Sequence, residues 1–256
     1  MMPLARLFSL ESEVAIVTGA GRGIGRACAL ALAEAGADVA LAARTGVDLE
    51  AVAQQIRALG RRAIVMLCDV NDENMLDELV ARTIRELGKI TLLVNNAGGT
   101  GPNDPLQMSG VAFADALVWN IIPAYSMIQK CVPHMNSAGG GAVVNISSVA
   151  ARDAQKQFSA YGSAKAAMSQ MTRNLAQDFA PSVRINAIAP AAILTPTLAQ
   201  FLTPERRERM VAGTPLGRLG QPEDIGAAAV FLCSAAAAWI TGKVLEVDGG
   251  AETPYF

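Results

Sequence analysis

The chain has 256 residues and a mass of 26.6 kDa; 52% of its residues are apolar, 17% are charged, and its formal net charge is -2. This composition supports a large buried core and excludes an intrinsically disordered chain, and the length suits one large α/β domain or two small ones. The slight negative charge and the lack of a basic run give no reason to expect a nucleic-acid partner.

The cysteine and histidine content limits the possible metal sites. His134 is the only histidine, and the four cysteines are far apart: Cys28, Cys68, Cys131 and Cys233. We therefore expect buried thiols in a reducing cytoplasm, no disulfide framework and no metal site.

Neither the start of the chain nor its apolar runs indicate a membrane partner. The first residues, MMPLARLFSLES, lack the apolar core of a secretory signal. The longest apolar stretch, Ala227 to Ile240, is shorter than the roughly 20 residues that cross a bilayer. A soluble, cytoplasmic protein is expected.

Short β-branched runs alternate with longer helical patterns in the first part of the chain, and glycines mark several of the helix ends. The predicted elements are a strand at Val14–Val17, a helix at Ile24–Ala35, a strand at Asp38–Ala42, a helix at Leu49–Leu59, a strand at Ala63–Leu67, a helix at Glu73–Leu87 and a strand around Leu92 to Val94.

The alternation continues in the second part. The predicted elements are a helix at Val111–Met135 bent at Pro123, a strand at Ala142–Ile146, a helix at Ser159–Phe179, a strand at Val183–Ile188, a helix at Ile225–Leu232 and a strand at Val244–Val247. Short, almost wholly apolar strands are typical of a parallel sheet covered on both faces. The sequence predicts a single α/β domain over residues 1–256, with a doubly wound, Rossmann-type, seven-stranded parallel sheet.

One long segment interrupts this alternation. Residues 191–223 contain four prolines, and short helices are expected around Thr195 to Leu202 and Pro204 to Ala212. A long insertion on the carboxyl side of a sheet often covers a ligand, so we expect a substrate lid at about 191–220. The alternative is an ordinary surface excursion.

A glycine-rich turn, TGAGRGIG, joins the first strand to the first long helix. Its glycines at 19, 21, 23 and 25 follow the spacing G-x-x-x-G-x-G. Backbone without side chains can approach a pyrophosphate closely, and the helix that follows points its positive end at the charge. The turn therefore favours a bound dinucleotide, and a glycine-rich turn without a ligand is the alternative.

Tyr161 and Lys165 lie four residues apart in the segment YGSAK, which is one helical turn. An ammonium about 4 Å from a phenolic oxygen favours the phenolate by about 4 kcal/mol at an effective dielectric constant of about 20. That is on the order of three pKa units, which predicts a Tyr161 pKa near neutrality. A phenol of this kind can exchange a proton with an alcohol at physiological pH.

Polar residues also close two of the central strands. The fourth predicted strand ends in NNAG, Asn95 to Gly98, and the fifth ends in VNISS, Val144 to Ser148. Ser148 could donate a hydrogen bond to a substrate oxygen, whereas a helix cap is its ordinary role; Asn95 and Asn96 could simply brace the turn. Together these segments meet at the carboxyl edge of the sheet, where ligands bind.

The chain resembles the short-chain dehydrogenase/reductase family over essentially its whole length. The motifs that carry this resemblance stand in the order of the family: TGAGRGIG, Asp69 with Val70, NNAG, Asn120, Ser148, YGSAK and the segment Leu216 to Gly250. Three segments resemble a group within that family, the bacterial 7α-hydroxysteroid dehydrogenases: NNAGGTGP, IAPAAILT and GTPLGRLGQPEDIGAAAVFLCSAAAAWITG.

The resemblance implies a role for each motif residue. Tyr161 is the proton donor or acceptor and Lys165 its electrostatic partner, Ser148 binds the reacting oxygen, and Asn120 holds a water that links Lys165 to solvent. The implied cofactor contacts are Gly19, Arg22, Gly23, Ile24, Gly25, Arg44, Asp69, Val70, Asn96, Ala97, Gly98, Tyr161, Lys165, Pro190, Ile193 and Thr195. Ala191 replaces the glycine usual in the family, and its methyl group is expected to crowd the nicotinamide or to shift the lid.

The end of the second strand bears on the choice of cofactor. An acidic residue there usually binds the ribose hydroxyl of NAD, but this chain has Arg44 and no acid in Leu41 to Thr45. A guanidinium can pair with a 2′-phosphate, and Arg22 adds charge nearby. We predict NADP(H) over NAD(H); the alternative is that Arg44 stacks on adenine or points to solvent.

The predicted function is an oxidoreductase that interconverts a secondary alcohol and a ketone with NADP(H), with a hydroxysteroid as the first substrate candidate. A 3-oxoacyl thioester or a sugar is an alternative substrate, and a non-catalytic dinucleotide sensor is an alternative function. The resemblance implies a homotetramer formed through the helices that hold Trp119 and Tyr161, and a second interface is expected at Ala235 to Ile240 and the last residues.

Overall fold

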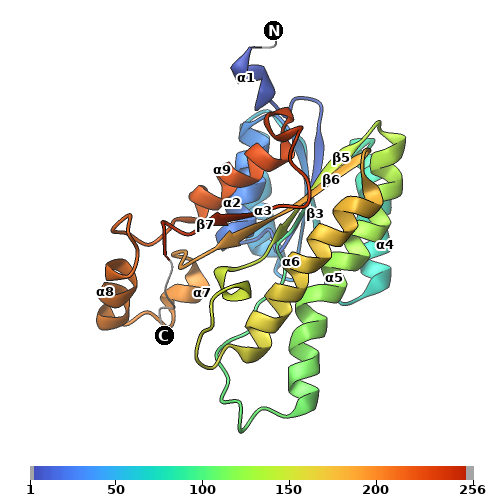
Figure 1. Ribbon diagram of the computed structural model, residues 1–256. Coiled ribbons are helices and arrows are strands. Elements are labelled where there is room, and N and C mark those ends of the chain that lie inside the picture. Colours follow the sequence, from blue (N-terminus) through green and yellow to red (C-terminus); the bar gives the residue numbers. More distant parts are fainter. Residues whose placement is uncertain (1–2, 252–256) are drawn as a thin grey trace.

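The centre of the molecule is one sheet of seven parallel strands (Figure 1); the computed structural model describes residues 3–251. The strand order is β3-β2-β1-β4-β5-β6-β7, with β1 Val14–Thr18, β2 Asp38–Ala43, β3 Ala63–Leu67, β4 Leu92–Asn95, β5 Gly141–Ile146, β6 Val183–Pro190 and β7 Val244–Val247. The order reverses between β1 and β4, where sheets of this type bind their ligands. The predicted doubly wound sheet is confirmed.

Helices cover both faces of the sheet (Figure 1). One face carries α2 (Gly23–Glu34), α3 (Gly46–Ala58) and α9 (Pro222–Cys233). The other carries α4 (Glu73–Leu87), α5 (Gly110–Ser137) and α6 (Ser159–Phe179).

The two faces have separate apolar cores because strand side chains alternate in direction. In β1, Ala15 and Val17 face the core beneath α2 and α9, whereas Val14 and Ile16 face the core beneath α4 and α5. All four side chains are buried. A strand buried on both faces must be apolar throughout, which explains the continuous apolar runs in the sequence.

Local capping explains where some helices begin and end. Asp72 caps α4, because its Oδ1 accepts a hydrogen bond from the backbone N–H of Asn74 at 2.9 Å. Gly88 ends the same helix with a φ of 92°, a left-handed conformation that glycine adopts without strain. These signals are local in sequence, so the predicted and observed bounds of α4 agree.

Most predicted elements are present within a few residues of their expected bounds, and α5 runs unbroken through Pro123 and Pro133. Between β6 and α9 lie α7 (Pro196–Ala199), which is shorter than predicted, and α8 (Pro204–Ala212), which matches its prediction. Three single-turn elements were not predicted, because such short helices carry no periodic signal: α1 (Leu4–Leu7), η1 (Val149–Ala151) and η2 (Ala235–Ala237).

Within residues 3–251, α5 is the one helix long and apolar enough to span a membrane, with a mean hydropathy of 1.4. The apolar stretch singled out from the sequence, at 227–240, is a different segment. This helix packs against the sheet, α4 and α6, and buries Asn120 and Met127. Part of its apolar surface is buried in the protein core, so this single helix is weak evidence for a membrane span.

Candidate active site

The glycine-rich turn is packed against the end of β4 without room for side chains. The Asn96 side-chain amide donates hydrogen bonds to the backbone oxygens of Thr18 (3.1 Å) and Gly19 (3.2 Å). A Cβ atom at Gly19 would lie 2.6 Å from the Asn96 Nδ2, and one at Gly25 would collide with the Gly19 carbonyl oxygen. Asn96 therefore braces the turn, as one sequence interpretation held, and the motif glycines are required by close packing.

The amino end of α2 opens into a cleft. Its N-cap residue, Arg22, makes no side-chain capping bond, and the first turn has no acidic residue. Backbone N–H groups at such a helix end attract an anion. Here the sequence supplies no side-chain acceptor for them, which suits a ligand phosphate.

This cleft has a volume of about 390 Å³ and lies at the predicted edge of the sheet. It is lined by twelve of the predicted cofactor residues: Gly19, Arg22, Gly23, Ile24, Arg44, Asp69, Val70, Asn96, Ala97, Gly98, Tyr161 and Thr195. Four other predicted cofactor contacts do not line it: Gly25, Lys165, Pro190 and Ile193.

Tyr161 and Lys165 occupy the first two turns of α6, and the structure brings them together as predicted. The Lys165 Nζ lies 5.7 Å from the centroid of the Tyr161 ring. The ammonium is buried and donates a hydrogen bond to the Ile146 carbonyl oxygen at 2.8 Å, at the end of β5. Tyr161 is partly exposed and reaches the cleft.

Ser148 has both of the roles that the sequence left open. Its Oγ accepts a hydrogen bond from the Ala150 N–H at 3.1 Å and so caps η1. Its hydroxyl is also hydrogen-bonded to the Tyr161 side chain, which lowers the phenol's pKa. The cap fixes the serine beside the tyrosine.

The predicted pKa of Tyr161 is wrong for this structure. Although the residue as a whole is partly exposed, desolvation by the surrounding protein raises the pKa of the phenol above its usual value, and the hydrogen bond to Ser148 opposes this only in part. Burial also lowers the pKa of Lys165 to about 8. The prediction assumed that the ammonium lies against the phenolic oxygen, but the Lys165 ammonium donates its hydrogen bond to the Ile146 carbonyl oxygen instead. Removal from water is the largest cause of the pKa shift of both groups.

Asn120 and Lys165 approach the same side of Gly98. A Cβ at Gly98 would be 2.9 Å from the Asn120 Oδ1 and 3.7 Å from the Lys165 Nζ. The Asn120 Oδ1 accepts from the Gly99 N–H at 2.8 Å, and its Nδ2 donates to the Ala116 carbonyl at 2.9 Å. The side chain thus fixes the loop after β4; its predicted water-holding role stays a prediction.

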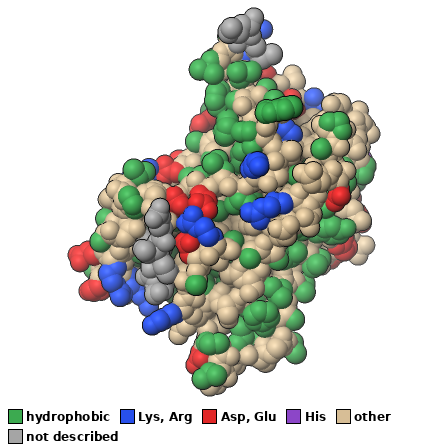
Figure 2. All heavy atoms as spheres, in the orientation of Figure 1, with side chains coloured by type: hydrophobic (Ala, Val, Ile, Leu, Met, Phe, Trp, Pro, Cys, Tyr) green, Lys and Arg blue, Asp and Glu red, His purple; other side chains and the backbone are tan. Residues whose placement is uncertain are grey.

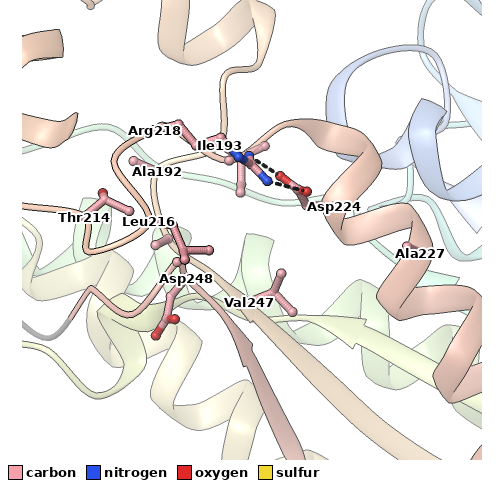
Figure 3. Close-up of a pocket in the computed structure, with 12 residues that line it drawn as sticks. Ala192, Ile193, Thr214, Leu216, Arg218, Asp224, Ala227, Val247 and Asp248 are labelled. Atoms are coloured by element: carbon pink, nitrogen blue, oxygen red, sulfur yellow. Dashed lines mark hydrogen bonds and ion pairs between the residues drawn. The ribbon is translucent and has the colours of Figure 1, made fainter.

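A second, smaller pocket of about 240 Å³ lies between the 191–220 segment, α9 and the end of β7 (Figure 3). Ile193 and Ala191 line this pocket and not the large cleft. Ala191 is also not among the described residues with a positive φ, so alanine fits there without strain. Ala191 does not line the large cleft, so the expected crowding of the nicotinamide is not supported, and the alternative effect, a shift of the lid, stays a prediction. Arg218 and Asp224 form a two-pronged ion pair at 2.7 and 2.9 Å (Figure 3).

The large cleft is also lined by Gly21, which belongs to the glycine-rich turn, and by several residues that were not predicted from the sequence: Ala43, Thr45, Asp48, Cys68, Trp119, Pro196 and Thr197. Trp119, expected on a helix of the tetramer interface, packs on the core, and the Arg44 Cζ atom lies over its ring, 5.6 Å from the ring centroid. Its position next to Asn120 was the available signal. No group of metal-ligating side chains is found within residues 3–251.

Comparison with known proteins agrees with this geometry. A family model described as Enoyl-(Acyl carrier protein) reductase matches residues 19–252. An uncharacterized oxidoreductase of Mycobacterium tuberculosis is 48% identical over 97% of this chain and 95% of its own length. The 7alpha-hydroxysteroid dehydrogenase of Escherichia coli is 42% identical over 94% of each chain. A solved 7 alpha-hydroxysteroid dehydrogenase, complexed with NADH and 7-oxo glycochenodeoxycholic acid, superposes with a TM-score of 0.94 at 41% identity and covers 98% of each chain.

The chain therefore belongs to the short-chain dehydrogenase/reductase family. This membership supports the predicted activity, an oxidoreductase that interconverts an alcohol and a ketone, and it implies a nicotinamide dinucleotide cofactor. The cleft fits such a cofactor, because the backbone at 19–25 is free of side chains and the uncapped end of α2 opens into it.

Proposed function

We propose that this alcohol–ketone interconversion uses NADP(H) and that Tyr161 carries the proton. The observation that supports this most directly is the position of Tyr161, which lines the cleft, is hydrogen-bonded to Ser148 and lies one helical turn from Lys165. When bound, the nicotinamide supplies or accepts a hydride at the substrate carbon.

The protein's own groups manage the proton. Because burial raises its pKa, Tyr161 keeps its proton at neutral pH and can donate it to a ketone oxygen as that oxygen becomes negative. The Ser148 hydroxyl is placed to donate a hydrogen bond to the same oxygen. Lys165, with a pKa of about 8, is mostly charged at pH 7 and stabilises the phenolate left behind.

The NADP(H) preference depends on charge at the part of the cleft next to the end of β2, where Arg44 lies; we call this part the adenosine end. Arg22 and Arg44 line the cleft, are exposed, and have no ion-pair partner within residues 3–251. Two acids, Asp48 and Asp69, also line the cleft, and the solved relative is complexed with NADH, so the proposal depends on the two arginines. Comparing kcat/KM for the two cofactors tests it, and Arg44→Asp should shift the preference toward NAD(H); a wild-type preference for NAD(H) would refute it.

For the substrate, we propose a ring ketone or its secondary alcohol, with hydroxysteroids first, on the strength of the likeness to 7alpha-hydroxysteroid dehydrogenase. A 3-oxoacyl thioester is the second candidate, because the matching family model is described as Enoyl-(Acyl carrier protein) reductase, and an enoyl substrate of that kind is also an acyl thioester; a sugar is the third. Absorbance of the reduced nicotinamide, followed with oxo bile acids, 3-oxoacyl thioesters and sugars, distinguishes them. Tight cofactor binding without turnover of any of them would favour the non-catalytic sensor.

We further propose that residues 1–256 act as one domain and that residues 191–220 are a lid over the substrate. A homotetramer is supported by an exposed apolar row on α5: Val111, Val118, Ile122 and Tyr125. The fully exposed Trp239 supports a second interface at 235–240, whereas the last residues, also predicted there, lie outside the described ones. The four free, buried cysteines support the proposed cytoplasmic location.

A further inference from the structure

Trp119 links the core of the protein to the adenosine end of the large cleft. Its ring is partly buried against the core beneath α4 and α5, which holds the indole in place. It also lines the cleft together with Asp69, Val70 and Arg44. Trp119 is therefore a fixed aromatic surface on the cofactor side of the site.

Arg44 lies on this surface. It follows the last residue of β2, and its Cζ atom is 5.6 Å from the centroid of the Trp119 ring, within the range of a cation–π contact. Arginines on nearby elements pair with carboxylates instead: Arg57 with Glu50 and Arg62 with Asp38. An aromatic face orients the guanidinium without neutralising it, so its charge and its planar fork of N–H donors stay available.

The two acids that line the cleft, Asp48 and Asp69, form no ion pair with Arg44 in the part of the chain that the structure describes. Asp69 uses its Oδ1 to accept hydrogen bonds from the backbone and side-chain amides of Asn71, both at 3.0 Å. Asp48 lies beside Gly21, where a Cβ atom would be 3.0 Å from the Asp48 Cβ. Arg22 adds a second positive charge to the same cleft.

We propose that Trp119 is a positioning residue for cofactor selection: its ring holds Arg44 where the guanidinium meets the 2′-phosphate of a dinucleotide. The inference rests on the proposed NADP(H) function and adds a residue to it. Replacing the ring with an aliphatic side chain of moderate size leaves the cleft wall apolar but frees Arg44. Discrimination between NADP(H) and NAD(H) then falls, while the affinity that both cofactors share is kept.

The first experiment uses the two tryptophans as reporters. Trp239 is fully exposed and does not line the cleft, so Trp239→Phe leaves Trp119 as the single tryptophan. We expect its emission to change as NADP+ is added, with a midpoint that matches the calorimetric Kd. The oxidised cofactor is used because it does not fluoresce. Unchanged emission while calorimetry reports binding would overturn the proposal.

The second experiment measures the Kd of NADP+ and of NAD+ by calorimetry for Trp119→Leu, Arg44→Gln and the double variant. A cation–π contact at an exposed site predicts that Trp119→Leu lowers the ratio of the Kd for NAD+ to the Kd for NADP+ by about two- to fivefold. Arg44→Gln should lower it further, and the double variant should equal Arg44→Gln, because the ring acts through the arginine. Trp239→Leu is the matched control and should leave both Kd values unchanged.

The outcomes separate the inference from the proposed function. If Trp119→Leu weakens both cofactors by one factor, or has an effect additive with Arg44→Gln, the ring is only a wall of the cleft and the inference fails. Measurements on the parent protein alone test the proposed function. If the parent binds neither cofactor, or prefers NAD+, the proposed function is wrong. Thermal unfolding of Trp119→Leu shows whether a loss of binding reflects loss of the fold.

Discussion

The two walls of the large cleft are built in different ways. On one side, the glycine-rich turn and the end of β4 are joined by Asn96 hydrogen bonds, and no Cβ atom fits at Gly19 or Gly25. On the other side, the 191–220 segment is tied mainly at its base, where Ile193 and Gly220 form a parallel bridge. On α8 only Met210 is buried, and Lys and Arg side chains gather over that helix (Figure 2).

The contrast shows which wall can change. Close packing on the glycine side leaves one backbone geometry, which suits a constant ligand such as a dinucleotide. The exposed segment can change its side chains with little effect on the core, which suits a substrate that differs among relatives. The walls touch where a Cβ at Gly23 would lie 3.3 Å from the Thr195 Cγ2.

The largest expected effect on activity comes from replacing Tyr161, which lines the large cleft. Removing a positioned acid typically costs about 10²- to 10⁴-fold in rate, so Tyr161→Phe should lower kcat by that much. Its Kd for NADP+ should stay within a few fold, because the glycine wall is intact. Steady-state kinetics and calorimetry check both. Turnover within tenfold of the parent enzyme would contradict the assigned proton donor.

The second prediction tests the rigid wall directly. In Gly25→Ala the added methyl group collides with the Gly19 carbonyl oxygen, and overpacking of this kind costs about 1–3 kcal/mol. We expect a lower melting temperature and cofactor binding weakened by about tenfold or more, since the turn must shift. Gly101→Ala is the control, because open space surrounds a Cβ there. Equal behaviour of the two variants would refute the packing argument.

The third prediction concerns Lys165, whose buried charge lies beneath the reactive tyrosine. Its pKa falls from 10.5 to about 8 in the folded protein, a difference that corresponds to about 3 kcal/mol. Below pH 8 the folded state bears this full penalty; it is relieved as the pH rises from 8 to 10.5, because only the unfolded chain then keeps the proton.

Lys165→Met removes the buried charge and also the hydrogen bond to the Ile146 carbonyl, which offsets about 1 kcal/mol of the gain. The variant should lose activity yet be more stable at pH 7 by about 2 kcal/mol. Its advantage should shrink between pH 8 and 10.5. Denaturant unfolding at several pH values measures this, and a variant less stable than the parent at every pH would contradict it.

These predictions also show what the sequence could reveal. The sheet, α4 and α6 were predictable because apolar periodicity and capping residues are local signals. Tyr161 and Lys165 were paired correctly, because helical spacing fixes their distance. The pKa of Tyr161 was not predictable, since it depends on burial and on Ile146, a residue far away in the sequence that holds the ammonium.

The Arg44–Trp119 contact was missed for a related reason. The sequence showed that Arg44 ends a strand and that Trp119 precedes Asn120, but their contact needs the sheet order that brings β2 close to α5. Likewise, the sequence could not show which pocket Ala191 lines, because that depends on how the 191–220 segment leaves β6. Contacts between distant elements are the part that local patterns do not carry.

The smallest expected effect tests the exposed wall. Arg218 and Asp224 pair at the base of the 191–220 segment, with side chains 51% and 32% exposed. Exposed pairs contribute about 0.2–1 kcal/mol, so Arg218→Gln should raise the substrate KM by no more than about fivefold. The Kd for NADP+ should not change, because the arginine lines only the small pocket.

The matched control for Arg218→Gln is Arg85→Gln, which breaks a somewhat more exposed pair with Glu78 on α4, on the opposite face of the sheet. Arg85→Gln should leave the substrate KM unchanged, because α4 does not line either pocket. Kinetics at saturating cofactor, with the ketone varied, separate the two variants. If Arg218→Gln changes cofactor affinity and leaves the substrate KM alone, the 191–220 segment belongs to the cofactor wall, and the division of the cleft into a rigid and an adaptable side is wrong.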